Sequence, residues 1–206
     1  MADNHFIIGI SGGSGSGKTS FVKALKEKVK GLDVCFISLD NYYLPREKQY
    51  TDEEGIKNFD LPESINAESL KEDLKNLLSG QPVEKLEYVF NNEKATAQTI
   101  TLHPAKIYII EGLFIYHYKE LKDVFDLKLY IHAKDNLKLI RRIRRDRIER
   151  NYPVEDVIYR YEHHVMPSYE KYILNYKEDV DIVINNNKSF DIALDLVSAY
   201  IQKRLA

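Results

Sequence analysis

A glycine-rich stretch near the amino terminus constrains this chain more than any other feature. Residues 12–19 read Gly-Gly-Ser-Gly-Ser-Gly-Lys-Thr, between an apolar run at residues 6–10 and a segment whose apolar side chains have helical spacing. A glycine, four residues and then Gly-Lys-Thr, placed between a strand and a helix, is the pattern of a phosphate-binding loop. A flexible linker of glycine and serine has no reason to carry lysine and threonine at that register. The stretch therefore predicts a nucleoside-triphosphate site.

Each residue type in this loop has a physical task. Glycines let the backbone wrap a polyphosphate with its N–H groups pointing inward, and the amino terminus of the following helix adds a favourable dipole. We expect the Lys18 ammonium to reach the β- and γ-phosphates and the Thr19 hydroxyl to ligate Mg²⁺. The residues predicted to bind the nucleotide are Gly12, Gly13, Ser14, Gly15, Ser16, Gly17, Lys18, Thr19 and Ser20.

Composition narrows the class of protein. The chain of 206 residues suits one domain with a sizeable core. Because 30 Lys and Arg stand against 32 Asp and Glu, for a net charge of −2, no overall field draws the chain to nucleic acid. The single cysteine, Cys35, excludes an internal disulfide and suits a reducing compartment. No apolar run approaches the roughly 18 residues of a membrane helix, so we expect a cytoplasmic protein without a membrane partner.

Strand-like and helix-like patterns alternate along the chain. Apolar runs typical of buried strands fall at residues 6–10, 32–39, 107–110, 127–131 and 180–184. Helical patterns fall at residues 21–29, 66–78, 135–150, 153–172 and 189–205, the fourth of which contains Pro167 and is expected to kink or divide there. This alternation predicts a parallel α/β sheet with helices on both faces. Two further β-like runs, at residues 83–90 and 96–102, predict a hairpin.

Two acidic side chains come directly after predicted strands, namely Asp40 and Glu111. Ligands of such sheets bind outside the carboxyl ends of the strands, so we expect both carboxylates on the face that holds the phosphate loop. Phosphoryl transfer needs a metal clamp on the phosphates and a group that orients or deprotonates the attacking hydroxyl. One carboxylate could serve each task, and the alternative is a pair of solvated acids at strand ends.

The predicted helix at residues 135–150 is crowded with arginines. They are Arg141, Arg142, Arg144, Arg145, Arg147 and Arg150. Guanidinium groups can neutralise charge on a transferring phosphoryl group, so we interpret this helix as part of a mobile lid over the triphosphate. The alternatives are a solvated basic face or a nucleic-acid patch. Interspersed acidic residues and the acidic balance of the whole chain favour the lid.

Aromatic and histidine side chains are numerous around the predicted site. Tyr42, Tyr43, Tyr88 and Phe90 fall in the long connection at residues 41–65 and in the hairpin, and some of them could stack on a flat ring. The six histidines show no metal-binding spacing, and the pair at residues 163–164 is interpreted as structural.

Taken together, these motifs resemble the uridine (uridine–cytidine) kinases. The matching segments in chain order are the glycine loop, Asp40-Asn41-Tyr42-Tyr43, Asn58-Phe59-Asp60, Glu111-Gly112, Arg142 to Arg150 and Asp181 to Ile184. The similarity spans nearly the whole chain. It implies a P-loop fold with a five-stranded parallel sheet and helices on both faces. It also implies an acceptor-side hairpin at residues 82–103 and an arginine-bearing lid at about residues 142–160, in one kinase domain over residues 1–206.

The resemblance also implies an activity, which is transfer of a phosphoryl group from ATP or GTP, with Mg²⁺, to the 5′-hydroxyl of a ribonucleoside. Uridine and cytidine are the first candidates. By position, Asp40 would be the general base, Asp60 would hold the ribose hydroxyls, and Glu111 would support Mg²⁺ beside Thr19. The family also suggests a homo-oligomer that acts on a small-molecule nucleoside.

Further roles follow from the same resemblance. Lys18, Arg142 and Arg145 are expected to stabilise charge during transfer, and Arg150 matches a further lid arginine. Tyr43, Tyr88 and Phe90 fall where the family packs aromatic rings around the acceptor.

The chain departs from the family pattern where the nucleobase is expected. Glu93 and Ala95 stand where the family's hairpin has a histidine and an arginine, Arg160 replaces a glutamine, and Tyr152 replaces a lid arginine. An ionised glutamate accepts hydrogen bonds but cannot donate, which suits an exocyclic amine better than uracil O4. These substitutions are expected to alter the choice of acceptor.

Two alternatives stand beside a pyrimidine nucleoside kinase. Residues 111–119 and 164–169 resemble the nicotinamide riboside kinases, so the acceptor could be another ribosyl compound. A nucleotide-binding regulatory protein without a small acceptor is the other, although the Asn-Lys-x-Asp guanine motif of GTP switches is absent from the sequence.

Overall fold

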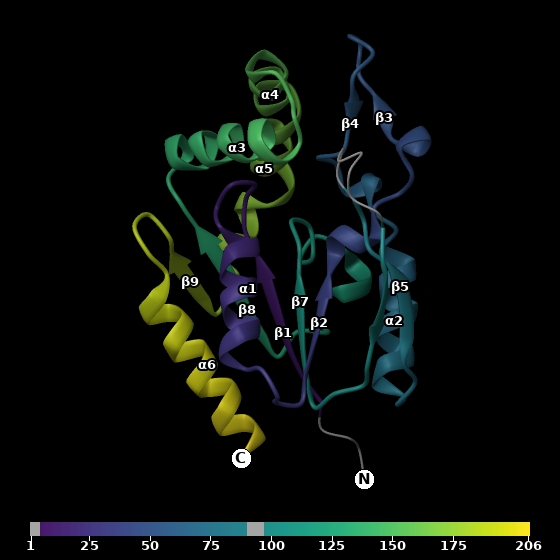
Figure 1. Cartoon of the computed structure of the whole chain (residues 1–206), viewed down its shortest axis with the longest axis vertical. Helices are drawn as coiled ribbons and strands as arrows, with labels where there is room; N and C mark the ends of the chain where they lie inside the picture. Colours follow the sequence, from purple (N-terminus) through teal and green to yellow (C-terminus); the bar gives the residue numbers. More distant parts are fainter. Residues whose placement is uncertain (1–4, 90–96) are drawn as a thin grey trace.

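Five parallel strands form the centre of the computed structural model, which describes residues 5–89 and 97–206 (Figure 1). In spatial order they are β2 (Val34–Ser38), β7 (Ile107–Glu111), β1 (Phe6–Ser11), β8 (Leu127–His132) and β9 (Ile182–Asn185). Each neighbouring pair is parallel, so all the carboxyl ends meet at one edge of the sheet. The predicted α/β fold with a five-stranded parallel sheet is confirmed.

Helices cover both faces of this sheet (Figure 1). Helices α1 (Lys18–Lys28) and α6 (Asp191–Leu205) pack against one face, where β1 contributes Ile8 and Ile10. Helix α2 (Ala67–Leu78) packs against the other face, where β7 contributes Tyr108 and Ile110. Because successive side chains of a strand point to opposite faces, strands covered on both sides are apolar throughout. This burial explains the continuous apolar runs of β1 and β7, whose residues are all buried.

Short elements connect the layers. Single turns of 3₁₀ helix lie at Leu39–Tyr42, Arg46–Lys48, Pro62–Ser64, Lys119–Leu121 and Leu174–Lys177. Helix α2 begins as predicted after Asn66, whose side-chain oxygen accepts a hydrogen bond from the Ser69 N–H at 3.1 Å. No helix in the described ranges combines the length and the apolar character that crossing a bilayer requires.

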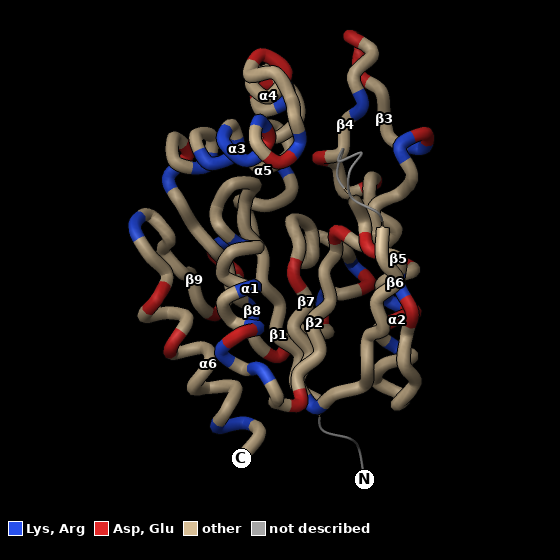
Figure 2. The backbone as a smooth tube through the Cα atoms, in the orientation of Figure 1, with Lys and Arg blue, Asp and Glu red and all other residues tan. Residues whose placement is uncertain are grey.

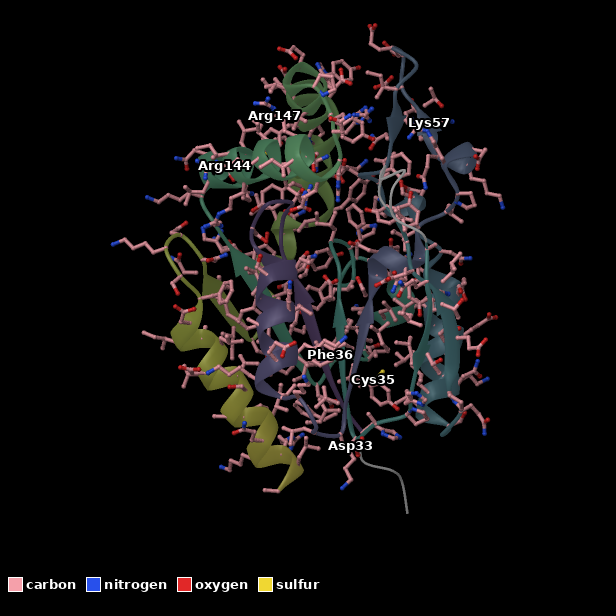
Figure 3. The ribbon with its side chains drawn as sticks, viewed as in Figure 1. Asp33, Cys35, Phe36, Lys57, Arg144 and Arg147 are labelled. Atoms are coloured by element: carbon pink, nitrogen blue, oxygen red, sulfur yellow. The ribbon has the colours of Figure 1, made fainter. Side chains whose placement is uncertain are left out.

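In the described part of the chain, two small antiparallel ribbons accompany the main sheet. The predicted hairpin is present as β5 (Val83–Leu86) and β6 (Thr99–Leu102), with shorter strands than the sequence pattern indicated. A second ribbon, β3 (Tyr50–Thr51) and β4 (Lys57–Asn58), lies within the connection that sequence patterns left without structure. Strands of two residues are too short to show an alternating pattern, which is why this ribbon escaped prediction. Figure 3 shows Lys57 on it, beyond the carboxyl edge of the main sheet.

The helical segment at residues 135–172, which includes the predicted lid at about residues 142–160 and takes its name, continues the chain above the carboxyl ends of the strands (Figure 1). It consists of α3 (Asp135–Glu149), α4 (Val154–Arg160), a π-helical segment (Tyr161–Val165) and α5 (Met166–Tyr172). Pro167 lies in the first turn of α5, directly after the π-helical segment. The backbone stays helical at Val165 and Met166, so the stretch changes its type of helix before Pro167, and the expected kink or division at Pro167 stays a prediction.

Candidate active site

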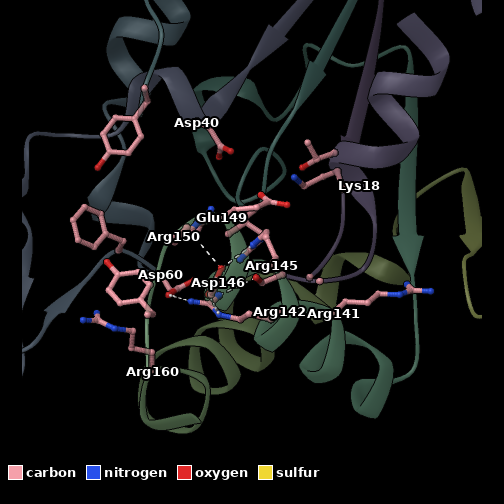
Figure 4. A pocket seen from close by; sticks show the side chains of 18 of the residues that line it. Lys18, Asp40, Asp60, Arg141, Arg142, Arg145, Asp146, Glu149, Arg150 and Arg160 are labelled. Atoms are coloured by element: carbon pink, nitrogen blue, oxygen red, sulfur yellow. Dashed lines mark hydrogen bonds and ion pairs between the residues drawn. The ribbon is translucent and has the colours of Figure 1, made fainter. Parts of the chain in front are cut away.

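A cleft of about 840 Å³ opens at the carboxyl ends of the strands (Figure 4). The phosphate loop, the turn after β2, the segment after β4 and the lid helices all contribute to its wall. The predicted site residues that line it are Gly13, Ser14, Gly15, Gly17, Lys18, Thr19, Ser20, Asp40, Tyr43, Asp60, Tyr88, Arg142, Arg145, Arg150 and Arg160. The glycine loop and Asp40 thus face one common space.

Five predicted residues are not among the described residues of this wall. Gly12 and Ser16 are buried behind the loop surface, and Glu111 is buried at the end of β7. Phe90 and Glu93 lie outside the described residues. The hairpin tip, where the sequence departs most from the family pattern, therefore stays a prediction.

The phosphate loop is braced from behind by residues outside the glycine motif. The Asn186 side chain donates to the Ser16 carbonyl at 2.8 Å, and Arg141 donates to the same oxygen at 3.4 Å. Gly17 has φ +95°, and a side chain there would collide with the Asn186 amide. The loop is therefore held by side chains that bind its backbone, and the Asn186 amide can approach this closely only because residue 17 is glycine. Asn186 was not among the predicted site residues, because a single asparagine after a strand forms no recognisable pattern.

Lys18 and Glu111 form a buried ion pair at the base of the loop. The Lys18 ammonium lies 2.8 Å from Glu111 Oε2, and the Ser38 hydroxyl donates to Glu111 Oε1 at 2.6 Å. Burial acts to lower the pKa of Lys18, but the carboxylates of Glu111 and Asp40 outweigh it, so this pKa is raised. Lys18 consequently keeps its positive charge at the floor of the cleft.

Asp40 occupies the turn that follows β2, and its carboxylate points into the cleft (Figure 4). Burial, and then the negative charge of Glu111, raise the pKa of Asp40 above its ordinary value against the opposing effect of Lys18. A carboxylate of raised pKa is a stronger proton acceptor than an ordinary aspartate. The position and the basicity of Asp40 both suit a general base.

The arginines of α3 divide into two groups. Figure 2 shows the basic residues along this helix, and Figure 3 shows Arg144 and Arg147 on it, both exposed and outside the described wall of the cleft. Arg141, Arg142 and Arg145 of α3 line the cleft, as does Arg150 directly after the helix. The predicted helix of arginines therefore presents only part of its charge to the site.

Asp146 holds the cleft-facing arginines together. Its carboxylate lies 2.8 Å from Arg145 Nε, 3.2 Å from Arg142 Nε and 3.4 Å from Arg150 Nη1, and its side chain is 4% exposed. Burial acts to raise the pKa of Asp146, but Arg145 and Arg142 outweigh it and hold this pKa below the ordinary value. In the sequence, Asp146 is only one of the acidic residues interspersed among the arginines. Its spacing of four residues from Arg142 and Arg150 is the signal that could have identified it.

Arg142 connects the two ends of the cleft. Its two terminal nitrogens each donate to a carboxylate oxygen of Asp60 at 3.4 Å, and Nη1 also donates to the Ser14 hydroxyl at 2.8 Å. A planar guanidinium can hold two partners in this way, whereas a lysine ammonium cannot reproduce its forked geometry. Arg142 thus fixes the segment after β4 relative to the phosphate loop.

Aromatic rings line the end of the cleft that lies away from the loop. The Tyr43 ring centroid lies 5.1 Å from that of Tyr88 and 6.1 Å from that of Phe59. Burial, followed by the charges of Asp40 and Asp60, raises the pKa of Tyr43 well above its ordinary value. These rings form a wall on which a planar group could stack. Phe59 was part of a matching segment but was not predicted as a site residue.

Arg160 stands at the same end, on α4. Its Nη1 donates to the Lys57 carbonyl at 3.0 Å, and its guanidinium carbon lies 5.1 Å from the Tyr152 ring centroid. Arg160 and Tyr152 both depart from the family pattern, and the structure places them in contact with each other and in the wall of the cleft.

Oxygen donors suited to a divalent cation lie beside the loop. Across residues 5–89 and 97–206, no group of three or more His, Cys, Asp and Glu side chains is placed to hold a metal ion. The Thr19 hydroxyl and the carboxylates of Asp40 and Glu111 are hard oxygen ligands near the loop. Because Mg²⁺ is usually bound by one or two such ligands together with substrate phosphates, this donor set fits it.

The parallel sheet and the glycine loop at its carboxyl edge define a P-loop nucleotide-binding protein. The chain belongs to the Phosphoribulokinase / Uridine kinase family, whose model matches residues 7–193. A uridine kinase of Macrococcus caseolyticus is 37% identical over 197 residues, which cover 95% of this chain and 95% of the relative. A uridine kinase of Streptococcus gordonii is 33% identical over 206 residues, which cover 100% of this chain and 98% of the relative.

Solved structures share the fold. A possible uridine kinase from Bacillus stearothermophilus is similar with a TM-score of 0.61 at 20% identity, covering 87% of this chain and 88% of that chain. Phosphoribulokinase from Rhodobacter spheroides is similar with a TM-score of 0.56 at 18% identity, covering 89% of this chain and 70% of that chain. These similarities support the architecture described above.

Proposed function

We propose that this chain transfers the γ-phosphoryl group of ATP to the 5′-hydroxyl of a ribonucleoside, with uridine and cytidine as the preferred acceptors. The observation that carries the proposal is that the phosphate loop, Asp40 and Asp60 line one cleft. The full-length similarity to uridine kinases supports the choice of acceptor class.

In the proposed reaction, Asp40 takes the proton of the 5′-hydroxyl as that oxygen attacks the γ-phosphorus, and ADP leaves. The charge that spreads over the transferring group is stabilised by Lys18, Arg142 and Arg145, in line with the usual requirements of phosphoryl transfer. Mg²⁺, when bound, neutralises charge on the β- and γ-phosphate oxygens. Its proposed ligands are the Thr19 hydroxyl and Glu111, directly or through water.

Glu111 has a second task in this proposal. Its Oε2 atom pairs with Lys18 at 2.8 Å. When Lys18 turns to the phosphates of the donor, this oxygen becomes available to the cation or to one of its waters. Ser38 keeps the carboxylate oriented through Oε1. Lys18 and Glu111 would therefore exchange partners together when the donor binds.

The acceptor is proposed to lie between Asp60 and the aromatic wall. The ribose hydroxyls would compete with Arg142 for the carboxylate of Asp60. This competition would free the guanidinium N–H groups of Arg142 to bind the phosphoryl group. Tyr43, Tyr88 and Phe59 would enclose the base. Arg150 and Arg160 offer only donors, so they suit the carbonyl oxygens of uracil, or the carbonyl oxygen and N3 of cytosine. Phe90 and Glu93 stay predicted acceptor contacts.

The proposal also covers the setting of the reaction. It includes one kinase domain over residues 1–206, action in the cytoplasm and a homo-oligomer without nucleic acid, as the resemblance to uridine kinases implies. Light scattering after size exclusion gives the mass of the assembly and so tests the last of these points.

A nucleoside panel tests the function directly. ADP release and phosphorylated product are measured with Mg²⁺, with ATP or GTP as donor, and with uridine, cytidine, adenosine, guanosine or nicotinamide riboside as acceptor. We expect kcat/KM for uridine or cytidine to exceed that for the others by about tenfold or more, since a hydrogen-bonding site rejects the wrong edge. If nicotinamide riboside alone were phosphorylated, the proposed acceptor would be this compound instead of a pyrimidine nucleoside. Tight ATP binding without any product would favour a regulatory protein.

A further inference from the structure

A contact outside the cleft joins the β3–β4 ribbon to the lid. Asp52, in the turn of the ribbon, accepts a hydrogen bond at Oδ2 from the Tyr159 hydroxyl at 3.0 Å. The same oxygen lies 2.7 Å from Nε2 of His164. The His164 side chain is 2% exposed and the Asp52 side chain 15% exposed, so the histidine side of this contact is buried. None of the three side chains is among the described residues that line the cleft.

The two oxygens of Asp52 have separate partners. Oδ1 accepts from the backbone N–H groups of Ile56 at 2.7 Å and Glu54 at 3.1 Å, which closes the turn of the ribbon. Oδ2 contacts the lid instead, through Tyr159 and His164. Burial acts to raise the pKa of Asp52, but the Ile56 N–H, His164 and Tyr159 outweigh it and hold this pKa below the ordinary value. Since an ionised carboxylate only accepts hydrogen bonds, Nε2 of His164 carries the proton in this contact.

The lid is shaped to present both partners. Tyr159 and His164 are five residues apart, and in a regular α-helix of 3.6 residues per turn they would point in different directions. The π-helical segment Tyr161–Val165 widens the turn between them, and their ring centroids lie 5.9 Å apart. Single π-helical turns are rare and are frequently found at functional sites. The irregularity therefore serves the contact with Asp52.

Among the described residues, Arg142 and Arg160 also join the lid to the ribbon or to the segment directly after it, and both arginines line the cleft. Arg142 binds Asp60, and Arg160 binds the Lys57 carbonyl. Asp60, Arg142 and Arg160 all line the cleft, so a substrate that contacts them competes with these bridges. The contact at Asp52 has no such competitor, and it is the bridge that can persist while the substrate is bound.

We propose that Asp52, His164 and Tyr159 form an outer clasp that keeps the ribbon and the lid at a fixed spacing across the acceptor end of the cleft. The clasp makes these three residues positioning residues, because it sets where Asp60 and Arg160 stand without touching the substrate. Its structural part is independent of the proposed function, whereas its kinetic consequence rests on that function.

A distance measurement tests the clasp without any acceptor. Spin labels are placed at Glu53→Cys on the ribbon and Glu155→Cys on α4, two exposed positions, in a Cys35→Ser background. We expect one narrow distance distribution in this parent and a broader, longer one after Tyr159→Phe or Asp52→Asn. The Asn side chain keeps an oxygen for the turn but presents an amide, which cannot accept from Tyr159. Tyr161→Phe is the matched control, since this hydroxyl makes only a 3.5 Å contact with the Asp135 carbonyl.

Steady-state kinetics test whether the clasp positions the acceptor end of the cleft. We expect Tyr159→Phe to raise KM for the nucleoside roughly tenfold, the usual loss for one hydrogen bond to a charged group, while KM for ATP changes less than about twofold. Rises of KM for both substrates, or for neither, would overturn the positioning role. Unchanged distance distributions in both clasp variants would overturn the clasp itself. If the parent phosphorylates no nucleoside, the proposed function fails while the distance result still decides the clasp.

Discussion

The two ends of the cleft are built in different ways. The donor end is one run of consecutive residues whose backbone, held by Asn186 and Arg141, makes the site. The acceptor end is made of side chains that are far apart in sequence, such as Asp60 and Arg142, which are separated by 82 positions. A site made by closely held backbone tolerates few substitutions. A site made by side chains changes its chemistry with each substitution. This chain keeps the phosphate-loop motif of the family at the donor end, and it departs from the family pattern at the acceptor end.

The largest effect is expected at the donor end. Gly17→Ala places a side chain against the Asn186 amide in a backbone of φ +95°, so nucleotide binding and turnover should both be lost. Calorimetry with ATP and an ADP-release assay measure the two. Gly31→Ala is the matched control, because Gly31 has φ +83° but open space around it. Retention of tight ATP binding by Gly17→Ala would show that the donor end is not set by its backbone.

The next largest effect is expected at Asp40, which lies between the donor and acceptor ends of the cleft. Asp40→Asn removes the proposed proton acceptor and keeps its shape, so kcat should fall by about 10²–10⁴-fold while ATP binding persists. Asp33→Asn is the control, since Asp33 is exposed at the opposite end of β2. Turnover near that of the parent would remove Asp40 as the base.

The difference between the two ends also explains what the sequence could predict. Strands such as β1 and β7 were predictable because burial on both faces makes them continuously apolar. The glycine loop was predictable because its chemistry lies in adjacent residues. The β3–β4 ribbon, the arginine cluster around Asp146 and the clasp at Asp52 arise from tertiary contacts, which leave no period in the sequence. The roles of the site residues stay predictions that the variants here test.

A smaller effect is expected for the arginine that joins both ends. Arg142→Lys keeps the charge but cannot bridge Ser14 and both oxygens of Asp60, so kcat should fall roughly 10²-fold, as when one charge-stabilising donor is removed. Steady-state kinetics measure this, and Arg144→Lys on the exposed side of α3 should change kcat little. Equal behaviour of the two variants would contradict the division of the arginines.

The smallest effect concerns the acceptor end alone. Asp60→Asn weakens the proposed grip on the ribose hydroxyls, so KM for the nucleoside should rise about tenfold, the loss of one hydrogen bond to a charged group. KM for ATP should stay within about twofold. Asp156→Asn, at an exposed position on α4, is the control. If only the KM for ATP changed, Asp60 would act at the donor end of the cleft, which would contradict its proposed contact with the ribose.

The pH dependence of kcat/KM for the nucleoside tests the central claim most directly, because it reports the protonation of the base in the free enzyme. A protonated Asp40 cannot accept the 5′-hydroxyl proton, so kcat/KM should fall tenfold per unit as the pH drops below the pKa of this carboxyl. Burial and Glu111 raise this pKa above the ordinary value of 3.8, so we predict an acid limb above that pH in the parent and none in Asp40→Asn. An acid limb at or below the ordinary value, or the same limb in both proteins, would contradict the account.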